Sequence, residues 1–149
     1  LSAVRNAAAK NRILRFPRMT GTLDMVPVDQ AAEHIGRSVQ DGRLETLFVT
    51  NPAPPQAEWV LDKTLNFYGV RNDLEVIDVS FEEYGEFDLT EEERTLYQFA
   101  SHFAPYWSMK YNFPQSICAD NLITKEYLSR ALKYFRDAEN PTYDNQRKN

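Results

Sequence analysis

Residues 23–40 have the sequence LDMVPVDQAAEHIGRSVQ, in which a short apolar segment runs directly into an amphipathic helix. Apolar residues recur at positions i, i+3, i+4, i+7 and i+11, which is the spacing of one helical face. They are Val28, Ala31, Ala32, Ile35 and Val39. Asp29 is of the residue type that caps helix N-termini, and Gly42 is of the type that ends helices. This stretch therefore predicts a helix that begins at Asp29 and ends at Gly42.

Strands and helices alternate on both sides of this helix. Residues 46–50 (TLFVT) and 74–79 are short apolar runs typical of buried strands. Between them, Ala57, Val60, Leu61, Leu65 and Tyr68 form one helical stripe that Gly69 ends. Upstream, residues 1–11 favour a helix and residues 13–16 a strand stopped by Pro17. This alternation predicts an α/β fold with crossover helices.

The second half of the chain is predicted to be mainly helical. Thr90 and Glu93 have the spacing of a capping box. The helix behind this box has one apolar face, formed by Leu96, Phe99, Ala100 and Phe103. A last helix is predicted to start near Thr124, and its apolar face comprises Leu128, Ala131, Leu132 and Phe135. We expect residues 1–80 to form part of a sheet with its helices, 81–137 a helical lobe, and 138–149 a flexible tail.

Composition excludes several classes of protein. The net charge of −5 argues against a nucleic-acid binder, and basic residues at the two ends, 5–18 and 147–148, flank an acidic middle. No apolar stretch has the roughly 18 residues that a membrane helix needs. The acidic segment 82–93 is expected to be a solvated face. Cys118 is the single cysteine, so no internal disulfide can form, and a reducing, cytoplasmic location is expected.

Several short motifs occur in an order that has a known counterpart. They are residues 26–29 (VPVD), 49–52 (VTNP), 67–70 (FYGV), 89–93 (LTEEE), 105–106 (PY) and 134–135 (YF). In this order they resemble the fatty acyl reductase and thioester reductase branch of the extended short-chain dehydrogenase/reductases. The resemblance covers residues 20–137. It implies the C-terminal part of a Rossmann-type fold with a mainly helical substrate-binding lobe.

The resemblance also implies a reaction and a missing half. Such enzymes reduce an acyl thioester to an aldehyde or alcohol with hydride from NADPH, while a Tyr–Lys pair acts on the carbonyl. Their Gly-rich cofactor loop and Tyr-x-x-x-Lys precede the VPVD motif, yet no tyrosine precedes Met25 here and no two glycines lie close together. We therefore expect no catalytic and no cofactor-binding residue in this chain, with NADP bound by residues outside it. A start at Leu1 fits a fragment.

An aromatic cluster is the predicted substrate pocket. It comprises Phe103, Tyr106, Trp107, Met109, Tyr111 and Phe113. Such residues either build a hydrophobic core or line an apolar tunnel for an acyl chain. Tyr106 and Lys110 also have the Tyr-x-x-x-Lys spacing, but they lie on the wrong side of the VPVD motif for a catalytic pair. His34 and His102 are interpreted as structural, no metal site is expected, and Asp24 with Asp29 is a weak acid–base candidate.

Two alternatives remain open at the level of sequence. The chain could belong to a sugar-nucleotide epimerase or dehydratase on the same scaffold, although such enzymes carry basic residues where this chain is aromatic. It could also be a stand-alone interaction domain that uses the aromatic face 103–113. Unpaired edges of the strands 46–50 and 74–79 predict a homo-oligomer, or association with the chain's own N-terminal half.

Overall fold

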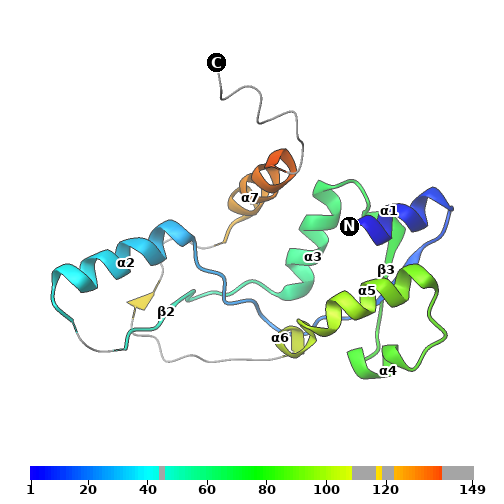
Figure 1. Ribbon diagram of the computed structural model, residues 1–149, viewed down its shortest axis with the longest axis horizontal. Coiled ribbons are helices and arrows are strands. Elements are labelled where there is room, and N and C mark those ends of the chain that lie inside the picture. The colour runs from blue at the N-terminus through cyan, green and yellow to red at the C-terminus, as the bar shows by residue number, and fades with distance from the viewer. Residues whose placement is uncertain (44–45, 109–116, 119–122, 139–149) are drawn as a thin grey trace, which may run out of the picture.

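The computed structural model describes residues 1–43, 46–108, 117–118 and 123–138 (Figure 1). The described part is mixed α/β, as predicted. Its helices are α1 (Ser2–Ala9), α2 (Val28–Gln40), α3 (Ala57–Phe67), the 3-10 turn η1 (Arg71–Asp73), α4 (Phe81–Gly85), α5 (Glu91–Ser101), α6 (Ala104–Ser108) and α7 (Lys125–Ala138). Its strands are β1 (Leu14–Pro17), β2 (Val49–Thr50), β3 (Leu74–Ile77) and β4 (Ile117–Cys118). In the described part of the second half, β4 is the single strand and the other elements are helices.

The strands form two small parallel pairs. β1 pairs with β3 in a register that joins Leu14 to Leu74 and Pro17 to Ile77. β2 pairs with β4, joining Val49 to Ile117. Parallel neighbours require a long crossover, and the one between β1 and β3 contains α2, β2 and α3. Only Val49 and Thr50 of the predicted strand 46–50 are in a ladder.

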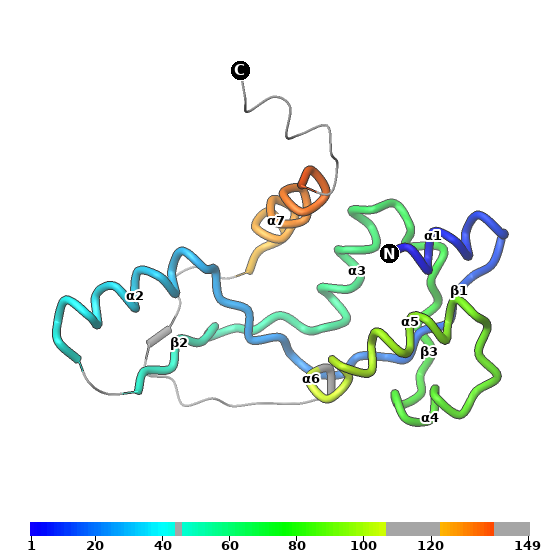
Figure 2. The backbone as a smooth tube through the Cα atoms, in the orientation of Figure 1, coloured from blue at the N-terminus to red at the C-terminus, as the bar shows by residue number. Residues whose placement is uncertain are grey.

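The core lies where the N-terminal helix, the β1–β3 sheet and α5 meet, and the tube in Figure 2 shows α1 and α5 beside each other. The apolar residues buried there come from these three segments and from α3: Val4, Ala7, Leu14, Phe16, Leu65, Leu74 and Ala100. Removing this apolar surface from water is the main favourable term for this part of the fold. The middle of the chain thus packs against its N-terminus.

The helix ends follow the sequence signals with one exception. Gly42 and Gly69 adopt positive φ angles of 65° and 70° just beyond α2 and α3, a conformation that glycine reaches without strain. The predicted capping role of Asp29 is wrong. Pro27 precedes the helix, and Asp29 lies in its first turn without a capping hydrogen bond. There its charge can still interact favourably with the helix dipole.

The apolar face of α2 is helical as predicted but is not covered by the described residues. Val28, Ile35 and Val39 are 80%, 64% and 75% exposed. The helix lies at the end of the molecule away from the β1–β3 sheet (Figure 1). The predicted stripe of α5 is also only partly buried, because Ala100 is buried whereas Phe99 is exposed. No helix in the described ranges is long and apolar enough to span a bilayer.

Candidate functional site

A cleft of about 360 Å³ opens at the carboxyl ends of β1 and β3. Its walls come from the residues that follow the two strands, from the start of α4 and from α6: Pro17, Arg18, Met19, Thr20, Asp78, Val79, Ser80, Phe81, Glu82, Glu83 and Ala104. In open parallel sheets, ligands bind in the crevice outside the carboxyl ends of the strands. Its volume is within the range of small-molecule sites. This cleft is the best-placed candidate site in the described part of the chain.

The strands themselves create the cleft. The Arg18 amide donates to the Ile77 carbonyl at 3.0 Å, which is the last ladder bond before the two chains diverge. Below it, Pro17 and Met19 are buried and give the cleft an apolar floor. The ring of Phe81 stacks on Tyr97 at 4.6 Å between centroids, which fixes one wall.

The charge in the cleft is predominantly negative. Arg18 lies 3.6 Å from Asp78, so its guanidinium is partly neutralised. Glu83 is held in a capping box, in which its carboxylate accepts from the Ser80 amide at 2.8 Å and its own amide donates to the Ser80 hydroxyl. That backbone hydrogen bond from Ser80 lowers the pKa of Glu83. With Glu82 also in the wall, three carboxylates face one guanidinium, an arrangement that repels a phosphate group.

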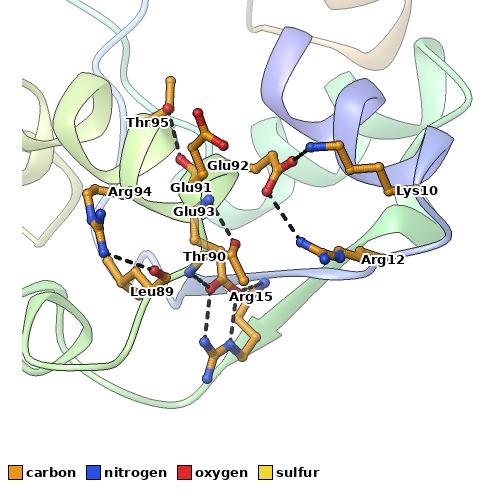
Figure 3. Close-up of polar contacts among 10 residues, drawn as sticks. All are labelled: Lys10, Arg12, Arg15, Leu89, Thr90, Glu91, Glu92, Glu93, Arg94 and Thr95. Atoms are coloured by element: carbon orange, nitrogen blue, oxygen red, sulfur yellow. Dashed lines mark hydrogen bonds and ion pairs between the residues drawn. The ribbon is translucent and has the colours of Figure 1, made fainter.

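Behind the cleft, a buried carboxylate attaches α5 to β1 (Figure 3). Glu93, whose side chain is 2% exposed, accepts from Arg15 Nε and Arg15 Nη2, both at 2.9 Å. It also accepts from the backbone amides of Arg15 and Thr90, both at 3.0 Å. Bidentate arginine–carboxylate pairs are among the strongest hydrogen-bonded pairs in proteins. We call Arg15, Glu93 and Thr90 the β1 clamp.

The β1 clamp is structural and is not suited to acid–base chemistry. Hydrogen bonding from Arg15 lowers the pKa of Glu93 to about 2, so this carboxyl stays ionised and gives no proton at neutral pH. The nearby Tyr84 hydroxyl donates to the Arg15 carbonyl at 2.6 Å. Burial raises the pKa of Tyr84 well above its ordinary value, so the phenol stays neutral. Both groups hold α4 and α5 in place beside the cleft.

The expectation that segment 82–93 is a solvated face is wrong at its end. Glu92 and Glu93 are both buried, and Glu92 pairs with Lys10 and, at 3.9 Å, with Arg12 (Figure 3). These partners lie in the basic segment near the N-terminus, about eighty residues away. The basic segment and the acidic segment meet in space, where their opposite charges pair. That sign segregation was the available signal for the clamp, which sequence reasoning missed.

The motif at residues 49–52 contacts the segment just before the VPVD motif at a second junction. The Asn51 amide donates to Asp24 Oδ1 at 2.7 Å, and Asn51 Nδ2 donates to the Met25 carbonyl at 3.1 Å. Asn51 Oδ1 accepts from the Ala53 amide at 2.9 Å. Asp24 therefore serves as a hydrogen-bond acceptor for the backbone, and Asp29 lies elsewhere, in α2. The acid–base candidate formed by these two aspartates is not assembled.

The predicted aromatic pocket is only partly described. Phe103 and Tyr106 are 47% and 58% exposed, and Phe103 lies 5.7 Å from Phe99 between ring centroids. They flank Ala104, which lines the cleft. The side chain of Trp107 and the whole of Met109, Lys110, Tyr111 and Phe113 lie outside the described residues.

The remaining polar candidates do not form a cofactor site within the described ranges. His102 is exposed with Nδ1 3.1 Å from the Gln98 carbonyl, and His34 is half-buried in α2. The described residues contain no group of three metal-ligating side chains. Gly42 and Gly69 follow the C-terminal ends of helices, whereas the glycines of a dinucleotide-binding loop lie just before the N-terminus of a helix. Together with the acidic cleft, this arrangement does not fit NADP.

No protein-family model, curated protein or solved structure matches this chain.

Proposed function

We propose that this chain is the substrate-binding part of a Rossmann-type, NADPH-dependent reductase of fatty acyl thioesters, with the acyl chain bound in the cleft at the carboxyl ends of β1 and β3. The position of the cleft carries the proposal, because that is where ligands bind in parallel α/β sheets. The order of short motifs from residue 26 to residue 135 supports the same reading. Since the described residues do not fit NADP, the hydride donor would be held by residues outside this chain.

The chemistry of the cleft supports a neutral substrate. Met19, Val79 and Phe81 offer apolar surface for an acyl chain, and the Thr20 and Ser80 hydroxyls lie at its wall. A thioester and the amides next to it carry no charge, and the phosphates of the carrier lie at the far end of its pantetheine arm. The carboxylates of Asp78 and Glu82 therefore do not repel the part that would enter the cleft. The same carboxylates oppose the diphosphate of a sugar nucleotide. This difference favours the acyl thioester over the epimerase alternative.

A binding experiment tests the proposal. A medium-chain acyl thioester of N-acetylcysteamine is titrated into the isotope-labelled chain, and amide shifts are followed by NMR. We expect the shifts to concentrate at Met19, Phe81 and Ala104. Ala104→Trp fills the cleft and should weaken binding by about tenfold or more, which is about 1.4 kcal/mol. Ala9→Trp, on an exposed position of α1, is the matched control and should leave affinity unchanged.

Three results would contradict the proposal. One is the absence of thioester binding, and another is equal affinity in Ala104→Trp and Ala9→Trp. The third is saturable binding of a uridine diphosphate sugar in the same cleft, which would favour the sugar-nucleotide alternative.

A further inference from the structure

The outer edge of β3 has backbone hydrogen-bonding groups with no partner among the described residues. In a parallel ladder, alternate residues direct both their N–H and C=O at the neighbouring strand. The bond from the Arg18 amide to the Ile77 carbonyl shows that Ile77, and with it Glu75, faces β1. Leu74 and Val76 therefore face outward. The Leu74 carbonyl accepts from Arg71 Nη1 at 3.0 Å, which leaves Val76 as the available position.

The opposite edge of the same sheet is closed. On β1 the outward residues are Arg15 and Pro17. The Arg15 amide donates to Glu93, and the Arg15 carbonyl accepts from the Tyr84 hydroxyl. Pro17 has no N–H to offer. Side chains of α4 and α5 thus take the place of a neighbouring strand on β1, so an added strand can join this sheet only beside β3.

Two hollows meet at Val76. One, of about 380 Å³, is lined by Trp59, Leu61 and Leu65 of α3, on the face of the sheet that is packed in the core. The other, of about 600 Å³, has two carboxylates and two guanidinium groups among its lining residues, which include Ile13, Arg18, Glu58, Arg71, Leu74 and Glu75. Glu75 points away from the core face because successive side chains of a strand alternate. An added strand would send alternate side chains toward the apolar α3 residues on one face and toward Glu75 on the other.

The charges beside Val76 define the partner. Arg71 is paired with Asp62 at 2.8 Å, and Arg18 with Asp78. The side-chain carboxylates of Glu58 and Glu75 have no hydrogen-bond or ion-pair partner among the described residues. We propose that the outer edge of β3 binds an extended segment of a separate protein in which apolar residues alternate with lysine or arginine, by strand addition. A second copy fits less well, because pairing two β3 edges brings the Glu75 side chains of both copies together.

The test uses the full chain and three short peptides: alternating lysine and valine, alternating glutamate and valine, and a scrambled lysine–valine sequence. NMR titration and amide hydrogen exchange report the site. We expect the alternating lysine–valine peptide to bind, to shift Val76 and the Trp59 indole, and to slow exchange of the Val76 amide. The other two peptides should bind about tenfold more weakly or not at all.

A charge reversal separates this site from general attraction to an acidic protein. The double variant Glu58→Lys with Glu75→Lys should weaken binding of the lysine–valine peptide by about tenfold or more and strengthen binding of the glutamate–valine peptide. Glu86→Lys with Glu91→Lys makes the same charge change at exposed positions just after α4 and at the start of α5, and should alter affinity by less than about twofold. All four positions are exposed, and far-UV circular dichroism verifies the fold.

Several outcomes would overturn the inference: no binding, equal binding of the three peptides, or shifts confined to the cleft around Ala104. Equal effects of the two charge reversals would do the same. Self-association of the unliganded chain through Val76 would show that a second copy occupies the edge. These experiments measure peptide binding and not thioester binding. The proposed function is therefore tested separately.

Discussion

The carboxylate of Glu93 joins three segments that are far apart in the chain. It caps α5 through Thr90, closes the outer edge of β1 through the Arg15 amide, and pairs with the Arg15 side chain. Breaking a buried ion pair by removing one partner typically costs several kcal/mol, because the other polar groups lose their hydrogen bonds. The stability of the β1–α5 contact is therefore concentrated in this one residue.

The pKa of Glu93 gives a pH dependence with a definite sign. Its folded pKa of about 2 lies below the ordinary value of 4.5, so its contribution is complete above about pH 4.5 and is lost as the pH falls toward 2. We expect Glu93→Gln to lower the free energy of unfolding by about 3 kcal/mol at neutral pH. The difference from the wild-type chain should shrink through that acidic window.

Urea unfolding at a series of pH values measures this difference. Glu91 is exposed and lies two residues before Glu93, so Glu91→Gln is the matched control. It should lower the free energy of unfolding by less than about 0.5 kcal/mol. A difference between wild type and Glu93→Gln that stayed constant from neutral pH to pH 2 would show that the carboxylate is not the titrating group.

At the scale of elements, most helices and strands could be predicted from local patterns. The capping box at Thr90 and the glycines 42 and 69 are short-range signals, and each is found as predicted. What could not be predicted is which faces are covered. The stripe of α2 has perfect helical spacing but stays exposed at Val28, because spacing reports the shape of a helix and not the presence of a neighbour.

The candidate site was predicted less well than the elements. The aromatic residues Phe103 and Tyr106 flank the cleft, but most of its wall comes from residues that follow β1 and β3. Their proximity depends on the pairing of strands about sixty residues apart, a long-range relation that no local pattern encodes. The pairing of Arg15 with Glu93 was hidden for the same reason, although the opposite charges of the two segments were visible.

Asn51 connects the segment before α2 to the one before α3. It is 2% exposed and makes three hydrogen bonds to the neighbouring backbone and Asp24. Two of them use its side chain. Asn51→Ala leaves the Met25 carbonyl and the Ala53 amide without these partners, so we expect a loss of about 2 kcal/mol in urea unfolding.

Asn66→Ala is the comparison for that experiment. Asn66 is exposed and bonds only to the Asp62 carbonyl within its own helix, so its replacement by the better helix former should be nearly neutral. Equal losses in the two variants would mean that the Asn51 junction adds nothing to stability.

At the scale of the whole molecule, α1 is a part of the core and not an appendage. Ala7 is fully buried against the cluster that includes Leu14 and Ala100. Ala7→Leu overfills this space, and we expect it to destabilise the chain by about 1–3 kcal/mol. Ala9→Leu, exposed on the same helix, should be neutral. Tryptophan fluorescence and circular dichroism should report the same midpoint, whereas separate transitions would show that α1 unfolds independently.

The closing of β1 by α4 and α5 has a consequence for synthesis. Translation proceeds from the N-terminus, so β1 leaves the ribosome long before Tyr84 and Glu93. At typical elongation rates of about 5–20 residues per second, several seconds pass before both have been made. For most of that interval the nascent strand has neither its β3 neighbour nor its side-chain cover, and exposed strand edges recruit other chains. Chaperone occupancy on stalled nascent chains should therefore drop once the stall site lets Glu93 emerge from the exit tunnel.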